Sequence, residues 1–229
     1  MIEISVSAFA SNRSRFEQDI KLIEESGADR IHFDIMDSKF VPSDGLTIDD
    51  YNVIRKTTNL PIDVHLMCVH NDLFINKLNS LAVTSIVFHP EAECDDNILP
   101  LLKKIKNKKN CGLALSPNVS LSIITKYIKF LDEVLILSSP PGTSGGVFQK
   151  NTYFKVKELE KIKLDFNPDL IISVDGSVKR EHIEELKQLG ANKIIIGREF
   201  FNQKFPHAFI SEINRCLIKN SVNTPIGFS

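Results

Sequence analysis

The chain has 229 residues, of which 42% are hydrophobic and 25% are charged, and its formal net charge is -1. Its length and composition suit a globular protein with one large domain or two small ones. A net charge this close to zero argues against binding to nucleic acid or to a membrane surface, because both partners attract a basic field.

Short runs rich in β-branched residues recur along the chain and predict strands. They cover residues 3–7, 30–35, 62–67, 85–89, 111–115, 133–137, 170–175 and 193–197. Helix-length segments lie between them. The first carries Phe16, Ile20 and Ile23 at helical spacing and ends at Gly27. The others cover 47–57, 71–81, 95–108, 120–130, 152–164, 179–189 and 199–218.

Strict alternation of strand and helix predicts a parallel sheet of the α/β class. Eight such units favour closure into a (β/α)₈ TIM barrel, and an open doubly wound sheet is the alternative. No linker or composition break suggests a second domain. We therefore expect residues 1–219 to form a single barrel domain and 220–229 to form a C-terminal tail, either disordered or packed on a partner.

The cysteines and the chain's N-terminal residues bear on localisation. The four cysteines form neither a CxxC pair nor a zinc-finger spacing, so we interpret them as buried or incidental thiols of a reducing compartment. The first residues, MIEISVS, lack the pattern of a signal peptide, and no apolar run approaches the roughly 20 residues that span a membrane. We expect a cytoplasmic protein.

Polar side chains share strand faces near the carboxyl ends of four predicted strands. They are Ser5 and Ser7 in the first, His32 and Asp34 in the second, Asp63 and His65 in the third, and Ser173 and Asp175 in the seventh. Active sites of (β/α)₈ barrels form at these strand ends. Satisfied core polar residues are the alternative, but buried charge without a partner is costly. Two imidazoles and two carboxylates suit a divalent cation such as Zn²⁺, and also Fe²⁺, Mn²⁺ or Co²⁺.

Glycine-rich segments follow the last three predicted strands and predict a phosphate site. They read PPGTSGG (140–146), DGSVKR (175–180) and GREF (197–200), and the last two open helices. Backbone N–H groups at helix N-termini bind phosphate, and the loops after strands 7 and 8 are the usual place in a barrel. Each glycine alone is weak support, since turns need glycine anyway.

These segments together resemble the pattern of the ribulose-phosphate 3-epimerases, which allulose-6-phosphate 3-epimerases share. The matching motifs are IHFDIMDSKFVP, DVHLM, FHPEA, LALSPN, PPGTSGG, SVDGS and IIIGREFF, in that order from about residue 4 to residue 202. The resemblance implies a TIM barrel of the ribulose-phosphate-binding type. It also implies an isomerase that inverts C3 of a ketose phosphate with one divalent metal ion, for which Zn²⁺ is our first choice.

The same resemblance implies roles for individual residues. Asp34 and Asp175 would be the catalytic acid/base pair, and the metal ligands would be His32, Asp34, His65 and Asp175. The residues that would contact the substrate or its phosphate are Ser7, Met36, His65, Met67, Gly142, Thr143, Ser144, Gly145, Gly176, Ser177, Gly197 and Arg198. Within this set, the two methionines would form an apolar wall around the reacting carbon.

The chain departs from the family pattern in the loops. Ser38 replaces a usual Gly, SDG follows FVP, LSSPPGTSGG lacks a Met and a Gln of the family motif, and Arg198 replaces a usual Ser. The metal and acid/base set is intact, whereas the loops that contact the sugar are altered. We therefore predict interconversion of D-ribulose 5-phosphate and D-xylulose 5-phosphate. The alternatives are a 3-epimerase of a hexulose 6-phosphate such as allulose 6-phosphate, and a non-catalytic sugar-phosphate-binding relative.

A related barrel aldolase or decarboxylase is disfavoured, because its DxKxxD signature needs a lysine where Met36 follows Asp34. As partners we expect a small ketose phosphate and further copies of the same chain, giving a homo-oligomer.

Overall fold

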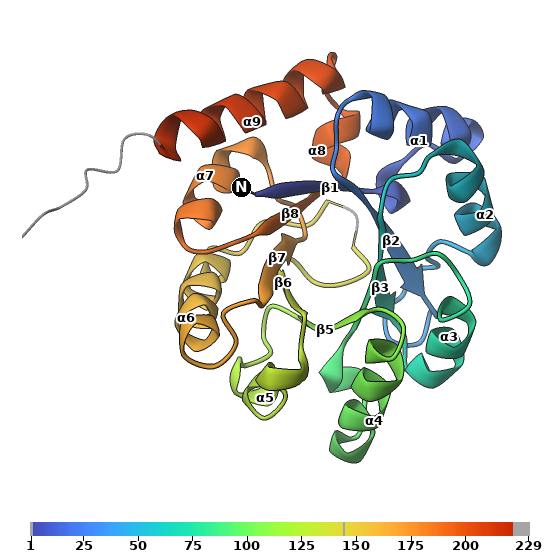
Figure 1. Cartoon of the computed structure of the whole chain (residues 1–229). Coiled ribbons are helices and arrows are strands. Elements are labelled where there is room, and N and C mark those ends of the chain that lie inside the picture. The colour runs from blue at the N-terminus through green and yellow to red at the C-terminus, as the bar shows by residue number, and fades with distance from the viewer. Residues whose placement is uncertain (1, 144, 222–229) are drawn as a thin grey trace, which may run out of the picture.

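The computed structural model describes residues 2–143 and 145–221, with side chains described through Arg215. Within these residues eight parallel strands close into a barrel in sequence order, from β1 through β8 and back to β1. Figure 1 shows the helices arranged as an outer ring around the strands. The prediction of a (β/α)₈ TIM barrel is confirmed.

The strands lie within one residue of their predicted bounds at either end. They are β1 (Glu3–Ser7), β2 (Arg30–Met36), β3 (Ile62–Met67), β4 (Ser85–Phe88), β5 (Asn110–Leu115), β6 (Glu133–Leu137), β7 (Ile171–Asp175) and β8 (Lys193–Ile196). All six residues of β3 are buried, as expected for a strand covered on both faces. The β2–β3 register pairs Asp34 with His65 and Met36 with Met67, which places the predicted site residues of the two strands side by side.

Most helices also agree with the prediction to within about three residues. They are α1 (Phe16–Glu25), α2 (Ile48–Thr57), α3 (Asn71–Leu78), α4 (Asp95–Lys106), α5 (Ser122–Thr125), α6 (Asn151–Phe166), α7 (Arg180–Gln188), α8 (Arg198–Phe201) and α9 (Pro206–Ser221). Short 3₁₀ turns cover Ala8–Ala10, Arg13–Arg15, Pro90–Ala92 and Ile128–Phe130. The start of α2 is fixed by a capping box, in which Thr47 and Asp50 exchange side chain–backbone hydrogen bonds.

Two predicted helices were wrong in extent. The segment 120–130 forms only α5 and the 3₁₀ turn Ile128–Phe130, with Lys126 and Tyr127 in a turn between them. The segment 199–218 is divided into α8 and α9 at Pro206, which opens α9 because proline is tolerated at the first position of a helix but not in its interior.

The predicted boundary between barrel and tail falls inside a helix. Helix α9 runs to Ser221, past the predicted last domain residue at 219. The remainder of the predicted tail, 222–229, lies outside the described residues.

The amino ends of the strands close the barrel with a buried ion cluster, here called the floor cluster and made of Arg30, Asp63, Glu133 and Lys193. The Lys193 ammonium group lies 2.7 Å from Asp63 and 2.8 Å from Glu133, and Arg30 donates to Asp63 at 3.0 Å. Ser173 donates to Glu133 at 2.6 Å. Thus Asp63 and Ser173, which share strand faces with His65 and Asp175, lie in the floor and not at the catalytic end. The interpretation that placed them with the strand-end polar residues was wrong.

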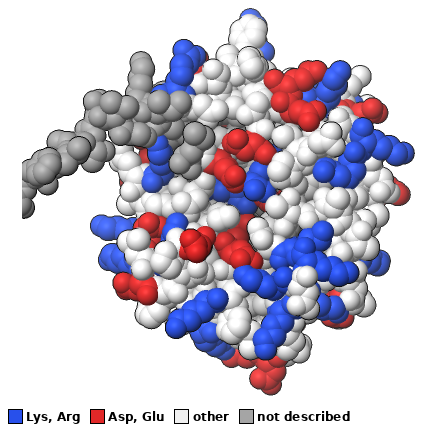
Figure 2. All heavy atoms as spheres, viewed as in Figure 1, with Lys and Arg blue, Asp and Glu red and all other residues white. Residues whose placement is uncertain are grey.

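No helix among the described residues has the length and apolar character needed to cross a membrane. On the face shown in Figure 2, acidic and basic side chains lie interspersed.

Candidate active site

The carboxyl ends of the strands surround a cavity of about 360 Å³. Its lining includes most of the predicted site residues, namely Ser7, Asp34, Met36, His65, Met67, Gly142, Thr143, Gly145, Asp175, Gly176, Ser177, Gly197 and Arg198. His32 lies close beneath this cavity, buried and within 3.2 Å of Asp34. Ser144 lies outside the described residues. The fold therefore brings together residues from four strands, β1, β2, β3 and β7, and from the loops after β6, β7 and β8.

The two histidines and two carboxylates form a compact cluster. One ligand-type atom from each of His32, Asp34, His65 and Asp175 lies within 4.8 Å of those of the others. His32 Nε2 is 3.2 Å from Asp34 Oδ1 and 3.7 Å from Asp175 Oδ2, while His65 Nδ1 is 3.3 Å from Asp34 Oδ1.

Three of the four imidazole nitrogens of this cluster are left without hydrogen bonds. Both ring nitrogens of His32 and Nδ1 of His65 are buried, and none has a hydrogen-bond partner of normal geometry among the described residues. An unsatisfied buried polar atom is costly and needs an explanation. A divalent cation supplies one, because imidazole nitrogen and carboxylate oxygen are its usual protein ligands. The residues present therefore fit a metal ion.

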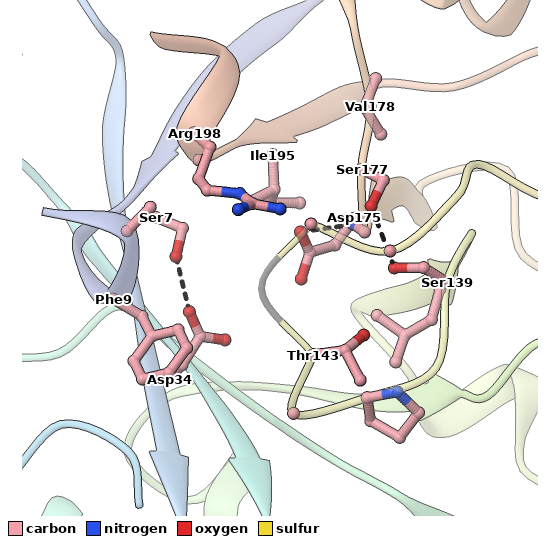
Figure 3. Close-up of a pocket in the computed structure, with 18 of the residues that line it drawn as sticks. Ser7, Phe9, Asp34, Ser139, Thr143, Asp175, Ser177, Val178, Ile195 and Arg198 are labelled. Carbon is pink, nitrogen blue, oxygen red and sulfur yellow. Dashed lines mark hydrogen bonds between the residues drawn. The ribbon is translucent and has the colours of Figure 1, made fainter. Parts of the chain in front are cut away.

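Each carboxylate of the cluster is anchored through one oxygen. Ser7 Oγ donates to Asp34 Oδ2 at 2.7 Å, and the backbone N–H of Gly176 donates to Asp175 Oδ1 at 2.6 Å. Figure 3 shows Asp34 and Asp175 on opposite sides of the cavity, with the hydrogen bond from Ser7 reaching Asp34 from above. Both carboxylates are thus oriented toward the space between them.

The environment shifts the pKa values of the two carboxyl groups in opposite directions. Burial opposes the ionisation of Asp34, but the adjacent His32 and His65 outweigh it and hold the pKa of Asp34 well below its usual range. Burial raises the pKa of Asp175; His32 counteracts this shift and the Asp34 carboxylate adds to it. Burial also disfavours charge on His32, yet Asp34 beside it raises the pKa of His32 to about 9. Two carboxyl groups with pKa values pushed apart are what paired acid–base chemistry requires.

The glycine-rich segments line the cavity at the ends of β6, β7 and β8. Gly176 has a φ of 91°, and a Cβ there would lie 2.6 Å from Ser139 Oγ, so the tight approach of these two loops requires glycine. The Arg198 guanidinium packs directly against Gly145, where a Cβ would lie 0.7 Å from Nη2. In Figure 3 the Arg198 side chain extends into the cavity between Ser7 and Asp175.

The sequence analysis missed several lining residues. They include Phe9, Ser139, Val178 and Ile195. Ile195 had a partial signal, since it lies on a predicted strand and faces the opposite side from Ile194 and Ile196, but three successive isoleucines do not show which side is the interior. Phe9 and Ser139 carried no comparable signal, because they follow strands whose loops the pattern does not place.

A closed parallel barrel with acid–base residues at the carboxyl ends of its strands defines the class of the protein: it is a (β/α)₈-barrel enzyme. Residues 3–201 match the sequence model described as the ribulose-phosphate 3 epimerase family. The chain belongs to this family and is an isomerase of the carbohydrate-phosphate epimerase type, which confirms the resemblance inferred from its motifs.

Curated relatives match nearly the whole chain. A protein from Escherichia coli (strain K12) named ribulose-phosphate 3-epimerase is 33% identical over 223 residues, covering 95% of this chain and 97% of its own length. Proteins of the same name from Buchnera aphidicola subsp. Acyrthosiphon pisum and Bacillus subtilis (strain 168) are each 32% identical, over 222 and 218 residues. The first match covers 93% of this chain and 94% of the relative, and the second covers 93% and 98%.

Solved structures share the fold at low sequence identity. KGPDC from Streptococcus mutans superposes with a TM-score of 0.69 at 16% identity, covering 94% of this chain and 98% of that one. Phosphoribosyl anthranilate isomerase from Thermus thermophilus gives a TM-score of 0.63 at 11% identity, covering 93% of this chain and 100% of that one. These likenesses support the barrel fold alone.

Proposed function

We propose that the chain is a metal-dependent 3-epimerase that interconverts D-ribulose 5-phosphate and D-xylulose 5-phosphate. One observation carries this proposal: Asp34 and Asp175 face each other across a cavity whose base holds two histidines with unsatisfied nitrogens. The names of the curated relatives support the pentulose phosphate as substrate.

Epimerisation at C3 beside a C2 ketone requires that a proton leave one face of the carbon and return to the other. The barrier is the negative charge that develops on the substrate oxygens in the enediolate. A divalent ion held by His32, Asp34, His65 and Asp175 would act as a Lewis acid toward that charge. The mixed nitrogen and oxygen donor set suits Zn²⁺ first, and also Fe²⁺, Mn²⁺ or Co²⁺.

The two carboxylates are placed for a two-base reaction. Asp34, whose pKa is depressed, is the ionised group that accepts the C3 proton, and Asp175, whose pKa is raised, is the group that donates a proton to the opposite face. The roles exchange in the reverse direction. The hydrogen bonds from Ser7 and from the Gly176 N–H hold each carboxylate in its orientation during the transfer.

The rest of the cavity orients the substrate and excludes water. Met67 is 3% exposed, and with Met36 it provides an adaptable apolar wall at the carboxyl ends of β2 and β3. The glycine-rich loops and Arg198 bind the phosphate, which fixes the distance from the anion to the reacting carbon.

The test is an assay of purified protein on a panel of ketose phosphates. We expect conversion of D-ribulose 5-phosphate, with slower or no conversion of hexulose 6-phosphates, about one divalent ion per chain by elemental mass spectrometry, and loss of turnover on metal removal. Faster turnover of a hexulose phosphate would instead support the alternative substrate class. Absence of turnover on every sugar, with binding retained, would support a non-catalytic relative.

A further inference from the structure

A line of buried polar side chains extends from His65 away from the cavity. His65 Nε2 lies 2.9 Å from Nε2 of His89, and Nδ1 of His89 lies 2.8 Å from Glu91 Oε1. Both histidines are 0% exposed. Neither His89 nor Glu91 lines the catalytic cavity, so neither contacts the substrate. This line is here called the His89 relay and is made of His65, His89 and Glu91, of which only His65 has a part in the chemistry proposed above.

The local sequence His89-Pro90-Glu91 produces this geometry. Strand β4 ends at Phe88, and Pro90 opens the 3₁₀ turn Pro90–Ala92, so the chain turns immediately after His89. The turn brings the Glu91 carboxylate back to the His89 ring two residues earlier. The Phe40 ring, 4.8 Å from that of His89, covers the imidazole from the neighbouring loop.

Glu91, at the end of the relay away from the cavity, is bonded to Ser116, which directly follows strand β5. Ser116 donates to Glu91 Oε1 from its backbone N–H at 3.2 Å and from its hydroxyl at 2.5 Å. The carbonyl of Ser116 accepts from the buried Lys155 ammonium group at 3.1 Å, and that group also donates to the Val119 carbonyl at 2.6 Å. The carboxylate that orients His89 is therefore itself held by Ser116, and the backbone of Ser116 is in turn held by Lys155 of α6.

The hydrogen-bond partners of the ring nitrogens determine the tautomers of His65 and His89. A carboxylate only accepts, so Nδ1 of His89 carries a proton and donates it to Glu91. The Nε2 atoms of His65 and His89, 2.9 Å apart, need one proton between them. Nδ1 of His65 makes no hydrogen bond among the described residues, whereas its Nε2 does, so we assign the proton shared by the two Nε2 atoms to His65. The lone pair of His65 Nδ1 then points at Asp34 Oδ1, 3.3 Å away.

We propose that His89 and Glu91 are positioning residues that fix His65 as the Nε2–H tautomer and direct its Nδ1 lone pair into the His32–Asp34–His65–Asp175 cluster. The inference rests on the proposed metal site. Outer hydrogen bonds of this kind set the orientation of a ligating histidine and raise its basicity, and their removal typically weakens metal affinity or activity about 10- to 100-fold.

The competing explanation is that His89 and Glu91 are only a hydrogen-bonded polar pair of the core. A core role predicts lost stability on substitution, but no change in the His65 tautomer and no specific loss of metal affinity. Two measurements separate the explanations: ¹⁵N NMR of the imidazole nitrogens in metal-free protein, and Zn²⁺ affinity by competition with a chromophoric chelator.

The informative variants are His89→Phe, His89→Gln and Glu91→Gln. His89→Phe removes the acceptor for His65 Nε2–H, whereas His89→Gln places an amide oxygen near the position of His89 Nε2 and can restore it. Glu91→Gln keeps the shape and removes the charge. The matched control is His182→Phe, which removes a partly buried histidine that stacks on Phe148 outside the relay.

In wild-type protein we expect His65 to carry its proton on Nε2. In His89→Phe we expect mixed tautomers and a Zn²⁺ affinity about 10- to 100-fold weaker, partly restored in His89→Gln, with about a 10-fold loss in Glu91→Gln. His182→Phe should bind Zn²⁺ with the affinity of the wild-type protein. Should His89→Phe fail to fold, His89→Gln and Glu91→Gln carry the test.

The relay is overturned if wild-type His65 carries its proton on Nδ1. It is equally overturned if the folded His89→Phe variant keeps the wild-type tautomer or binds Zn²⁺ as tightly as His182→Phe. If His89→Phe does not fold, the same results in Glu91→Gln overturn it. A wild-type protein that bound no divalent ion would refute the metal chemistry of the proposed function, and the tautomers of the metal-free proteins would then decide the relay alone.

Discussion

Asp34 and Asp175 carry the same functional group but are held differently. Asp34 accepts a hydrogen bond from Ser7 and lies against two imidazoles. Asp175 accepts a hydrogen bond from a backbone N–H, and burial raises its pKa. We predict that Asp34→Asn and Asp175→Asn each lower epimerisation by at least about 10²- to 10⁴-fold, the range for a general acid or base. Because the two groups serve opposite faces, one variant retains exchange of the C3 proton with solvent without inversion.

Deuterium wash-in from D₂O, followed by NMR of the recovered sugar phosphate, measures exchange and inversion separately. Ser7→Ala is the matched control, since it removes the hydrogen bond to Asp34 and leaves both carboxylates in place. Near-normal turnover in either Asn variant would refute the two-base assignment.

Among the departures of this chain from the family pattern, Arg198 in place of a usual Ser has the clearest consequence for substrate binding. Its guanidinium packs on Gly145 and lines the cavity, while the residue as a whole stays exposed. A guanidinium there adds charge-assisted hydrogen bonds to a phosphate. We predict that Arg198→Ser raises KM with little change in kcat, the pattern of lost uniform binding. The expected loss is on the order of 1.5–3 kcal/mol, the range for hydrogen bonds to charged groups.

Steady-state kinetics on D-ribulose 5-phosphate measures this effect, and Arg198→Lys serves as the matched control. Lysine keeps the charge but loses the planar contact with Gly145, so its KM should lie between those of wild type and Arg198→Ser. A KM that stays the same in Arg198→Ser for every ketose phosphate tested would exclude Arg198 from phosphate binding.

At the scale of elements, the floor cluster joins β2, β3, β6 and β8 through buried charges. Lys193 is 2% exposed and bonds to both Asp63 and Glu133. Removing one partner of a buried ion cluster leaves uncompensated charge, which typically costs about 3–5 kcal/mol. We predict that Lys193→Met lowers the free energy of unfolding by about this amount at pH 7, measured by urea denaturation.

The pH dependence of that loss follows from Asp63. Burial opposes the ionisation of Asp63, but Lys193 and Arg30 lower its pKa in the folded state. Its stabilising contribution is therefore present above its unfolded pKa of about 3.9 and disappears as the pH falls through the lower folded value. The penalty of Lys193→Met should accordingly shrink below about pH 4. Lys161→Met, which breaks an exposed ion pair with Glu158, should cost less than about 1 kcal/mol. Equal losses in the two variants would contradict the floor cluster's role.

Elements and site were predictable from sequence to different degrees. The alternation of β-branched runs with helical segments predicted a parallel sheet, because strands buried on both faces, such as β3, form continuous apolar runs, and the count of eight units favoured the barrel over an open sheet. Strand faces also identified His32, Asp34, His65 and Asp175. A strand face does not reveal depth along the barrel axis, however, so Asp63 was grouped with His65 although it lies in the floor.

Contacts between loops could not be predicted from the sequence pattern. The packing of Arg198 on Gly145 depends on the path of the β6 loop, and the contact of His65 with His89 depends on the turn after β4. FHPEA was recognised as a motif, but nothing in its spacing placed its histidine against that of β3.

Across the whole molecule, the four-residue cluster connects strands that are distant in sequence. Its members come from β2, β3 and β7, so a bound cation would tie one side of the barrel to another through charged ligands. A ligand that binds only the folded state stabilises it by mass action, by about 2.7 kcal/mol at 100 times its Kd. For a chain of this size each kcal/mol moves Tm by roughly 2–4 °C, so saturation should raise Tm by roughly 5–11 °C. Calorimetry of the protein with a chelator and with added Zn²⁺ measures the shift. His65→Ala, which removes one donor, should lose most of both the metal and the shift. An identical Tm with and without metal in wild-type protein, or a full shift in His65→Ala, would show that the cation, if bound, is held elsewhere.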